Sequence, residues 1–219
     1  MIKLSPGTVF ELTGVSASGK TAILAILDKN NKNIRIFNSG LTKSPDVKIR
    51  MAGRIFNEIK NLYNLFFYGK DLLDFRKIKW LLLTAFKVEA TYLFRINIFL
   101  NCILKFSYHA TLRRYTSDTI VFIIDEGVSH IPFLLQDQNE CNQMIEEYFI
   151  RFGELLSKIN VLYLDGDGVN TVERLMNRGH KRLKNRNIGD ARVFDKKNRE
   201  TISLIIDGSE VFKSFEKIN

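Results

Sequence analysis

Eight residues near the start of the chain restrict its fold more than any other feature. Residues 14–21 read GVSASGKT and match the pattern G-x-x-x-x-G-K-[ST] at every fixed position. The apolar run at 8–12 predicts a buried strand before the motif, and residues 20–27 predict a helix after it. Two glycines between a strand and a helix allow the backbone a tight turn. The motif therefore predicts a strand–turn–helix unit of an α/β fold.

The rest of the chain alternates between predicted strands and predicted helices. Further strands are expected at 34–37, 119–124, 160–164 and 201–206, and helices at 47–109, 139–158, 172–185 and 210–217. Each strand is a continuous apolar run, which is typical of a parallel sheet covered by helices on both faces. We therefore expect one α/β domain over residues 1–219, a three-layer sandwich with a parallel sheet of about five strands.

The motif at 14–21 is also a phosphate-binding pattern. Its glycines let successive backbone N–H groups point at phosphate oxygens, and the N-terminus of the following helix attracts anions. Lys20 is expected to reach the β- and γ-phosphates, and the Thr21 hydroxyl to bind Mg²⁺. The motif thus predicts a P-loop NTPase fold with ATP and Mg²⁺ as cofactors. The residues expected around the phosphates are Gly14, Ser16, Ala17, Ser18, Gly19, Lys20 and Thr21.

Acidic residues follow the predicted strand at 119–124. Ligands of such folds bind at the carboxyl ends of the strands, so Asp125 is expected to hold Mg²⁺ beside the motif. Glu126 is the next residue, and its side chain is expected to point the other way. It would then be free for another task, such as that of a general base. We expect both acids to be catalytic.

Two later predicted strands also end in acidic turns. Asp165 and Asp167 lie between glycines, which favours a turn before a helix that begins near residue 170 or 171 over a metal site. Asp207 follows the predicted strand at 201–206 and is a candidate contact to the nucleotide.

Most of the positive charge lies in one segment. The formal net charge is +9, and residues 171–199 hold ten Lys or Arg against three acids, a net +7. Arg174, Arg178 and Arg182 are four residues apart and would share one face of a helix. Arginines stabilise the charge on a transferring phosphoryl group, so Arg174 is expected to bind nucleotide and Arg178 and Arg182 to act in catalysis. A solvated face or a nucleic-acid patch is the alternative.

Composition narrows the class of protein further. Two cysteines exclude a disulfide scaffold, and the longest apolar stretch, around residues 80–83, is far shorter than the ~18 residues of a membrane span. The first residues lack the apolar stretch of a secretory signal. His109, His130 and His180 lack metal-ligand spacing, so no catalytic metal besides Mg²⁺ is expected. These features predict a cytoplasmic protein without a membrane span.

Together, the segments GVSASGKT, DEG, NVLYLDGDGVNTVERLMNRGHKR and ISLIIDGS are similar to the nucleoside and nucleotide kinases, and most of all to the thymidylate kinases. The resemblance covers most of the chain. In that family an acid ends the middle strand, as Asp125 does here, and an R-x-x-x-R stretch such as Arg174 and Arg178 forms a lid over the phosphates. The resemblance implies transfer of the γ-phosphoryl group of Mg-ATP to a hydroxyl or phosphate of a small molecule. It also implies an acceptor pocket shaped by a helical insertion at about 47–116 and a lid at about 171–199.

One departure from that family bears on the acceptor. Many such kinases use an arginine after the strand-end acid to grip a monophosphate acceptor, and this chain has Glu126 there. A neutral hydroxyl acceptor, such as a nucleoside or sugar, is therefore favoured, with Asp125 or Glu126 accepting its proton.

Two other functions compete with this one. A P-loop switch or motor is suggested by Asp125, Glu126 and the nearby His130, although no LSGGQ-type signature occurs between residues 22 and 124. A polynucleotide-directed kinase would use the basic tract at 171–199 on phosphate backbones. A nucleic-acid partner is less expected than a nucleotide and a small-molecule acceptor.

Overall fold

The centre of the molecule is a parallel sheet, seen in a computed structural model that describes residues 7–30, 33–37, 59–114, 119–136, 140–166, 168–178 and 187–218. Its five strands are β1 (Val9–Gly14), β2 (Ile34–Phe37), β3 (Val121–Asp125), β4 (Asn160–Leu164) and β5 (Ser214–Lys217). The strand order is β2-β3-β1-β4-β5, and every pairing is parallel. β1 is central, with Leu12 opposite Asp125 of β3 and Gly14 opposite Leu164 of β4. The carboxyl ends of these three strands therefore meet at one edge of the sheet.

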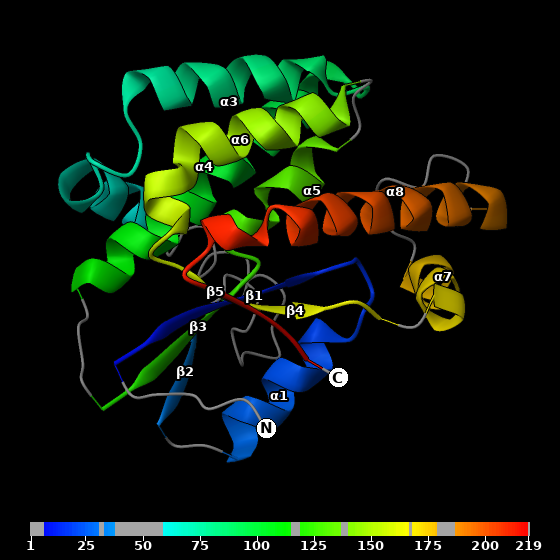
Figure 1. Cartoon of the computed structure of the whole chain (residues 1–219), viewed down its shortest axis with the longest axis horizontal. Coiled ribbons are helices and arrows are strands. Elements are labelled where there is room, and N and C mark those ends of the chain that lie inside the picture. Colours follow the sequence, from blue (N-terminus) through cyan, green and yellow to red (C-terminus); the bar gives the residue numbers. More distant parts are fainter. Residues whose placement is uncertain are drawn as a thin grey trace.

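Helices cover both faces of this sheet (Figure 1). On one face lies α1 (Lys20–Asn30), which follows β1 directly. A larger helical layer covers the other face and consists of α3 (Phe75–Lys87), α4 (Tyr92–Arg114), α5 (Ile131–Leu135), α6 (Cys141–Leu156) and α8 (Ile188–Asp207). Residues 59–68 form a further helix, α7 (Gly168–Arg178) follows β4, and η1 (Val128–His130) and η2 (Ser209–Val211) are single 3₁₀ turns. The expected α/β fold with a parallel sheet is confirmed.

Alternate strand residues pack against the two helical layers. Phe10 and Leu12 of β1 join Leu24 of α1 in the core below the sheet. On the opposite face, Ile124 of β3 packs with Tyr108 of α4. Because both faces are apolar, the strands are continuous apolar runs in the sequence, as parallel sheets require.

The larger core lies among the helices of the thicker layer. Four buried aromatic side chains, Trp80, Phe106, Tyr148 and Phe152, come from α3, α4 and α6. The Phe152 ring lies 4.9 Å from that of Tyr148, 5.2 Å from that of Phe106 and 5.9 Å from that of Trp80. One aromatic side chain of α6 therefore joins the three helices. No helix in the described part of the chain has the length and hydropathy needed to cross a membrane.

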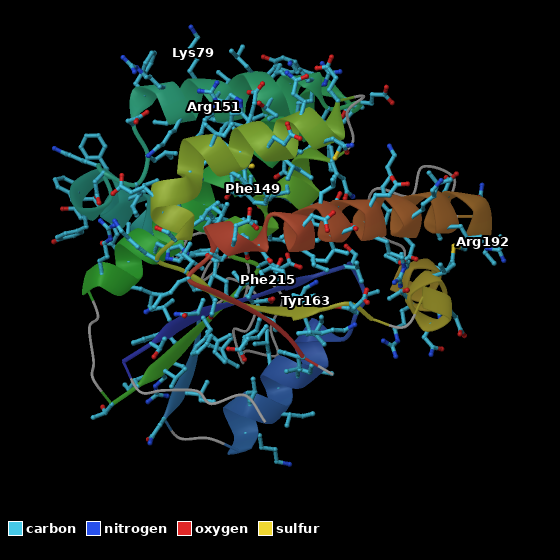
Figure 2. All side chains as sticks on the ribbon, viewed as in Figure 1. Lys79, Phe149, Arg151, Tyr163, Arg192 and Phe215 are labelled. Carbon is cyan, nitrogen blue, oxygen red and sulfur yellow. The ribbon has the colours of Figure 1, made fainter. Side chains whose placement is uncertain are left out.

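A second row of aromatic rings packs β5 against α6 and β4. The rings of Phe149, Phe212, Phe215 and Tyr163 follow one another at centroid distances of 6.0, 5.5 and 4.9 Å. Figure 2 shows Phe215 of β5 beside Tyr163 of β4. This row joins α6 to β5 and β4, and it holds a four-residue strand at the edge of the sheet.

Two predicted elements near the end of the chain are wrong. Residues 201–206 form the last part of α8 and not a strand, and residues 210–217 contain part of η2 and then β5, not a helix. The run 201–206 resembles a strand only in isolation. Buried Ala191, Phe194, Asn198, Thr201 and Ile205 recur every three or four residues, which is the period of one helix face.

The other predicted elements agree with the structure where it describes them. The predicted strands at 8–12, 34–37, 119–124 and 160–164 correspond to β1, β2, β3 and β4, and the helices at 20–27 and 139–158 to α1 and α6. The predicted helical stretch at 47–109 contains the 59–68 helix, α3 and most of α4, and its first part lies outside the described residues. Likewise α7 is the first part of the predicted basic helix, and residues 179–186 are outside the description.

We expect Phe152→Ala to lower the free energy of unfolding by about 3–5 kcal/mol, because it empties a fully buried aromatic site. Urea denaturation followed by circular dichroism measures the change. Ile150→Ala is the matched control, because Ile150 lies on the same helix with 83% of its surface exposed. It should change stability by less than about 0.5 kcal/mol. Equal effects of the two substitutions would contradict the packing described for α6.

Candidate active site

The motif loop, residues 14–21, leaves the end of β1 in a conformation that requires glycine. Gly14 has φ +139°, and a Cβ atom there would lie 2.1 Å from the Leu164 carbonyl oxygen of β4. Gly19 has φ +103°, which is also unfavourable for an L-residue with a side chain. Between them Ala17 has φ +65°. Backbone conformation therefore requires glycine at both positions, and at Gly14 the close contact with β4 also excludes a side chain.

Lys20 lies folded back over this loop. Its ammonium group donates to the Gly14 and Val15 carbonyl oxygens at 2.9 and 3.0 Å. It also lies 3.3 Å from the Glu126 carboxylate, which follows β3. The Lys20 side chain is buried, whereas Thr21 on the first turn of α1 is exposed. The Lys20 ammonium group is thus held at the centre of the motif loop, at the edge of the sheet where three strands end.

The turn after β4 packs closely against the motif loop. Gly166 has φ +75°, and a Cβ atom there would lie 3.0 Å from the Ser18 Cα and Cβ atoms. The Ser18 hydroxyl is buried and has no hydrogen-bond partner in the described structure. A buried hydroxyl without a partner is costly, so the loop offers a polar group that a bound ligand could satisfy.

The two acids at the end of β3 differ in their surroundings. Burial, followed by the charge of Glu126, raises the pKa of Asp125 to about 6, although Lys20 and Lys105 oppose this rise. Burial also opposes ionisation of Glu126, but His130, Lys20 and Lys105 outweigh it and hold the pKa of that carboxyl well below its ordinary value. The pair therefore consists of one readily ionised acid and one that titrates nearer neutral pH.

The Glu126 side chain has ionic partners in the structure, whereas the sequence predicts a side chain free for another task. It has φ +56°, an unusual backbone conformation for a residue with a side chain. Its carboxylate lies 3.3 Å from Lys20 and 3.5 Å from the His130 ring. His130 is buried, lies 3.4 Å from the Thr13 hydroxyl and stacks on Phe133. Glu126 is therefore in direct contact with the motif lysine.

A buried carboxylate holds the acidic turn in place. Glu11 of β1 accepts hydrogen bonds from the Val128 and Ser129 backbone N–H groups at 2.8 and 2.7 Å and contacts His109 of α4. Burial opposes its charge, but these hydrogen bonds and the charge of His109 hold the pKa of Glu11 below its ordinary value. A Cβ atom on Gly127 would lie 2.1 Å from the Glu11 carboxylate, which explains the glycine of the DEG sequence.

Two more side chains bind the carbonyl groups of the same turn. Lys105 of α4 donates to the Glu126 carbonyl oxygen, and the Tyr148 hydroxyl of α6 donates to the Val128 carbonyl oxygen at 2.8 Å. Burial lowers the pKa of Lys105 and raises that of Tyr148. The turn is consequently held by β1, α4 and α6 together.

The sequence interpretation missed these supporting residues, although one signal was present. Glu11 is a charged residue inside the apolar run TVFEL, and a buried charge needs partners. Nothing in the sequence indicates that the partners would be His109, Lys105 and Tyr148, because they come from helices far along the chain.

The arginines of the basic tract have different positions. The Arg174 guanidinium donates to the Ala17 carbonyl oxygen at 3.3 Å, so α7 contacts the motif loop. Arg178 is the last residue of α7, and the position of its side chain lies outside the description. Arg182 also lies outside the described residues. Its predicted role and that of Arg178 stay predictions.

Part of the basic tract at 171–199 pairs with acidic residues of the same chain. Arg199 of α8 binds Asp195 at 2.8 Å, and Asp165 and Thr171 at 3.3 Å each. Lys217 of β5 binds the second Asp165 oxygen at 3.3 Å. Both Asp165 oxygens are occupied, which favours a structural role for Asp165 over metal binding, and Asp167 lies outside the described residues.

Asp207 lies in a different place from the one that the sequence predicts. This residue ends α8 and precedes β5, so it does not follow a strand. The chain after it returns to the amino end of the sheet, where the Lys213 N–H group donates to the Ile159 carbonyl oxygen at 3.0 Å. The motif loop lies at the carboxyl ends of the strands, and Asp207 is therefore a poor candidate for a nucleotide contact.

Oxygen ligands suitable for Mg²⁺ occur beside the motif loop. Among the described residues, no group of three or more His, Cys, Asp or Glu is arranged to hold a metal ion. Mg²⁺ does not need such a group, since it commonly uses one or two carboxylates together with substrate phosphates. Asp125 and Thr21 fit that pattern, and the crowding of Asp125 by Glu126 would be relieved by a cation.

Comparison of the chain with protein-family models and with curated proteins found no match.

We expect Glu11→Gln to lower the free energy of unfolding at pH 7 by about 1.5–3 kcal/mol, because it removes a buried carboxylate that accepts two backbone N–H hydrogen bonds. The pKa of Glu11 is lower in the folded protein than in the unfolded chain, so its contribution is present above pH ~4.5 and lost as the pH falls through the folded-state pKa. The difference between wild type and variant in urea denaturation should therefore shrink at low pH. Glu216→Gln, at an exposed position of β5, is the control and should have little effect. A pH-independent difference would contradict the role of the charge.

Proposed function

We propose that this protein is a P-loop phosphotransferase of the nucleoside and nucleotide kinase type. It would move the γ-phosphoryl group of Mg-ATP to a hydroxyl or phosphate group of a small molecule, with a neutral hydroxyl favoured. The observation that carries the proposal is the meeting of Lys20, inside a glycine-bounded loop, with Glu126 at the end of the neighbouring strand.

The binding of nucleotide follows from the motif loop. Its sequence pattern, its position between a central strand and a helix, and its two glycine conformations support a role as a phosphate cradle. Lys20 would exchange the Gly14 and Val15 carbonyl oxygens for phosphate oxygens, and the buried Ser18 hydroxyl would gain a partner. Asp125 and Thr21 would hold Mg²⁺, which neutralises charge on the phosphates when bound.

Glu126 supplies the base for a hydroxyl acceptor. The acceptor oxygen forms a new bond to the γ-phosphorus, the bond from that phosphorus to the β–γ bridging oxygen breaks, and ADP leaves. The acceptor proton passes to the Glu126 carboxylate. In the structure Glu126 pairs with Lys20, and His130, Lys20 and Lys105 together hold the pKa of Glu126 down. Once Lys20 binds the phosphates, Glu126 becomes a stronger base, while His130 keeps it oriented.

The basic tract supports a small ligand over a polymer. Arg174 reaches the motif loop, and Arg199 is engaged by two carboxylates of the same chain. Cations that neutralise their own protein contribute little to binding a nucleic-acid backbone. Arg174 is placed to contribute to charge stabilisation on the transferring phosphoryl group, and Arg178 and Arg182 would complete the lid.

We expect Lys20→Met to abolish the thermal stabilisation by Mg-ATP and to lower kcat by about 10²–10³-fold, because it removes a charge from the phosphate site. Differential scanning fluorimetry and a coupled assay of ADP formation, screened over nucleosides and sugars, measure the two effects. Lys29→Met is the control, because Lys29 is exposed at the other end of α1. If Mg-ATP stabilised Lys20→Met and wild type equally, the proposal would fail.

Glu126→Gln should keep Mg-ATP binding within a few-fold of wild type and lower acceptor-dependent ADP formation by about 10²–10⁴-fold, because the amide cannot accept the proton. Glu146→Gln on the exposed side of α6 is the matched control. Rapid ATP hydrolysis without an acceptor, lost in Glu126→Gln, would instead indicate a switch or motor.

A further inference from the structure

The helix at 59–68 turns two asparagines toward the protein and most of its apolar side chains toward solvent. Asn61 and Asn64 are buried against α4. The Asn64 side-chain amide donates to the Thr111 hydroxyl, which in turn donates to the Asn61 carbonyl oxygen, both at 3.0 Å. This arrangement is the reverse of the usual one, in which the apolar side of a surface helix faces the core.

The outward side of this helix forms a continuous apolar stripe. Its members are spaced three and four residues apart, so they share one face, and each is at least 38% exposed. The Tyr63 and Phe67 rings lie 4.3 Å apart, and those of Phe66 and Phe67 lie 5.3 Å apart. Single exposed apolar residues are ordinary, but a contiguous set marks an interaction surface. We call this set the outer stripe, and it consists of Ile59, Leu62, Tyr63, Phe66 and Phe67.

The outer stripe continues into an apolar groove. A groove of about 380 Å³ is lined by Leu62 and Phe66 of the stripe, by Lys70, and by Ile78 and Ile103 of α3 and α4. The apolar surface therefore extends from the 59–68 helix to its junction with α3, and a basic side chain lies at its margin.

The chain segment that holds the outer stripe and part of the groove is also basic. Residues 59–83 hold five basic side chains and two acidic ones, a net +3. Of the two acids, Asp71 binds Arg113, and Asp74 caps α3 by accepting from the Lys77 N–H group. Lys79 is exposed and points away from the body of the protein (Figure 2). The five basic residues are Lys60, Lys70, Arg76, Lys77 and Lys79, of which Lys77 is half-buried with its ammonium group 5.9 Å from the centre of the Phe152 ring, and the other four are exposed.

This combination favours an anionic lipid surface over a second copy of the chain. In a two-fold dimer the same patch lies on both sides of the contact, so the basic residues of the two copies would oppose one another. A membrane with anionic headgroups instead attracts those residues and receives the aromatic and aliphatic side chains at its surface.

We propose that this protein binds the surface of anionic lipid membranes through the outer stripe, with the helix at 59–68 parallel to the membrane plane. The absence of a membrane-spanning helix from the described residues is compatible with such surface binding. In Figure 1 the 59–68 helix (cyan) lies on the opposite side of the view from α7, which contacts the motif loop. The bound surface would therefore leave the motif loop accessible. This inference does not depend on the proposed function.

Sedimentation of the full chain with lipid vesicles tests the proposal. Vesicles of phosphatidylcholine alone are compared with vesicles of phosphatidylcholine and phosphatidylserine at a 2:1 ratio. Wild type should bind the anionic vesicles more tightly, and binding should weaken as NaCl screens the headgroups. A Phe66→Ser/Phe67→Ser double variant should lose at least tenfold in affinity, since each buried phenyl ring contributes on that scale.

Ile150→Ser is the matched control, because Ile150 is an exposed apolar residue of α6 outside the outer stripe and its substitution should leave binding unchanged. Circular dichroism establishes that both variants are folded, which is expected because the substituted side chains are exposed. Three results would overturn the proposal: no binding of wild type to anionic vesicles, equal binding by Phe66→Ser/Phe67→Ser, or a wild-type dimer that this variant converts to monomer.

Discussion

The candidate site depends on one buried carboxylate. Glu11 lies in the central strand, entirely out of contact with solvent, and its two oxygens bind the backbone of the turn that follows β3. Gly127 is required because its missing side chain leaves room for that carboxylate. The interaction fixes the backbone two and three residues after Glu126, and the Glu126 carboxylate contacts Lys20. A charge buried in the middle of the sheet thus holds the turn that carries Glu126, the contact of the motif lysine.

Topology explains why these residues meet at all. β1 lies between β3 and β4, so the turns that follow all three strands share one edge of the sheet. The motif loop, the DEG turn and the turn after β4 each contain a glycine in close contact with a neighbouring segment, namely Gly14, Gly127 and Gly166. Glycine at these positions permits backbone approaches that any side chain would block. The Arg174 contact then brings α7 over the motif loop, which makes a compact polar site from segments distant in sequence.

The sequence predicts the parts of the fold whose signals are local. The motif at 14–21 and the apolar runs that form β1 to β4 depend on neighbouring residues, and their predictions are confirmed as strands and a helix. The run at 201–206 was wrongly predicted because its β-branched residues suit a strand, whereas packing of Phe194, Asn198 and Ile205 along one face makes it helical. The placement of Asp207 was wrong for the same reason. The contacts of Glu11, Lys105 and Tyr148 could not be predicted, since they depend on how distant helices pack on the sheet.

The central claim is that the motif loop binds the β- and γ-phosphates of a nucleoside triphosphate. Isothermal titration of the wild-type protein with Mg-ATP and with AMP, at the same temperature and ionic strength, tests it most directly. The account predicts that Mg-ATP binds at least tenfold more tightly than AMP, because AMP lacks the phosphates that Lys20 and the loop N–H groups contact. Equal affinity for the two ligands, or no binding of Mg-ATP, would contradict it.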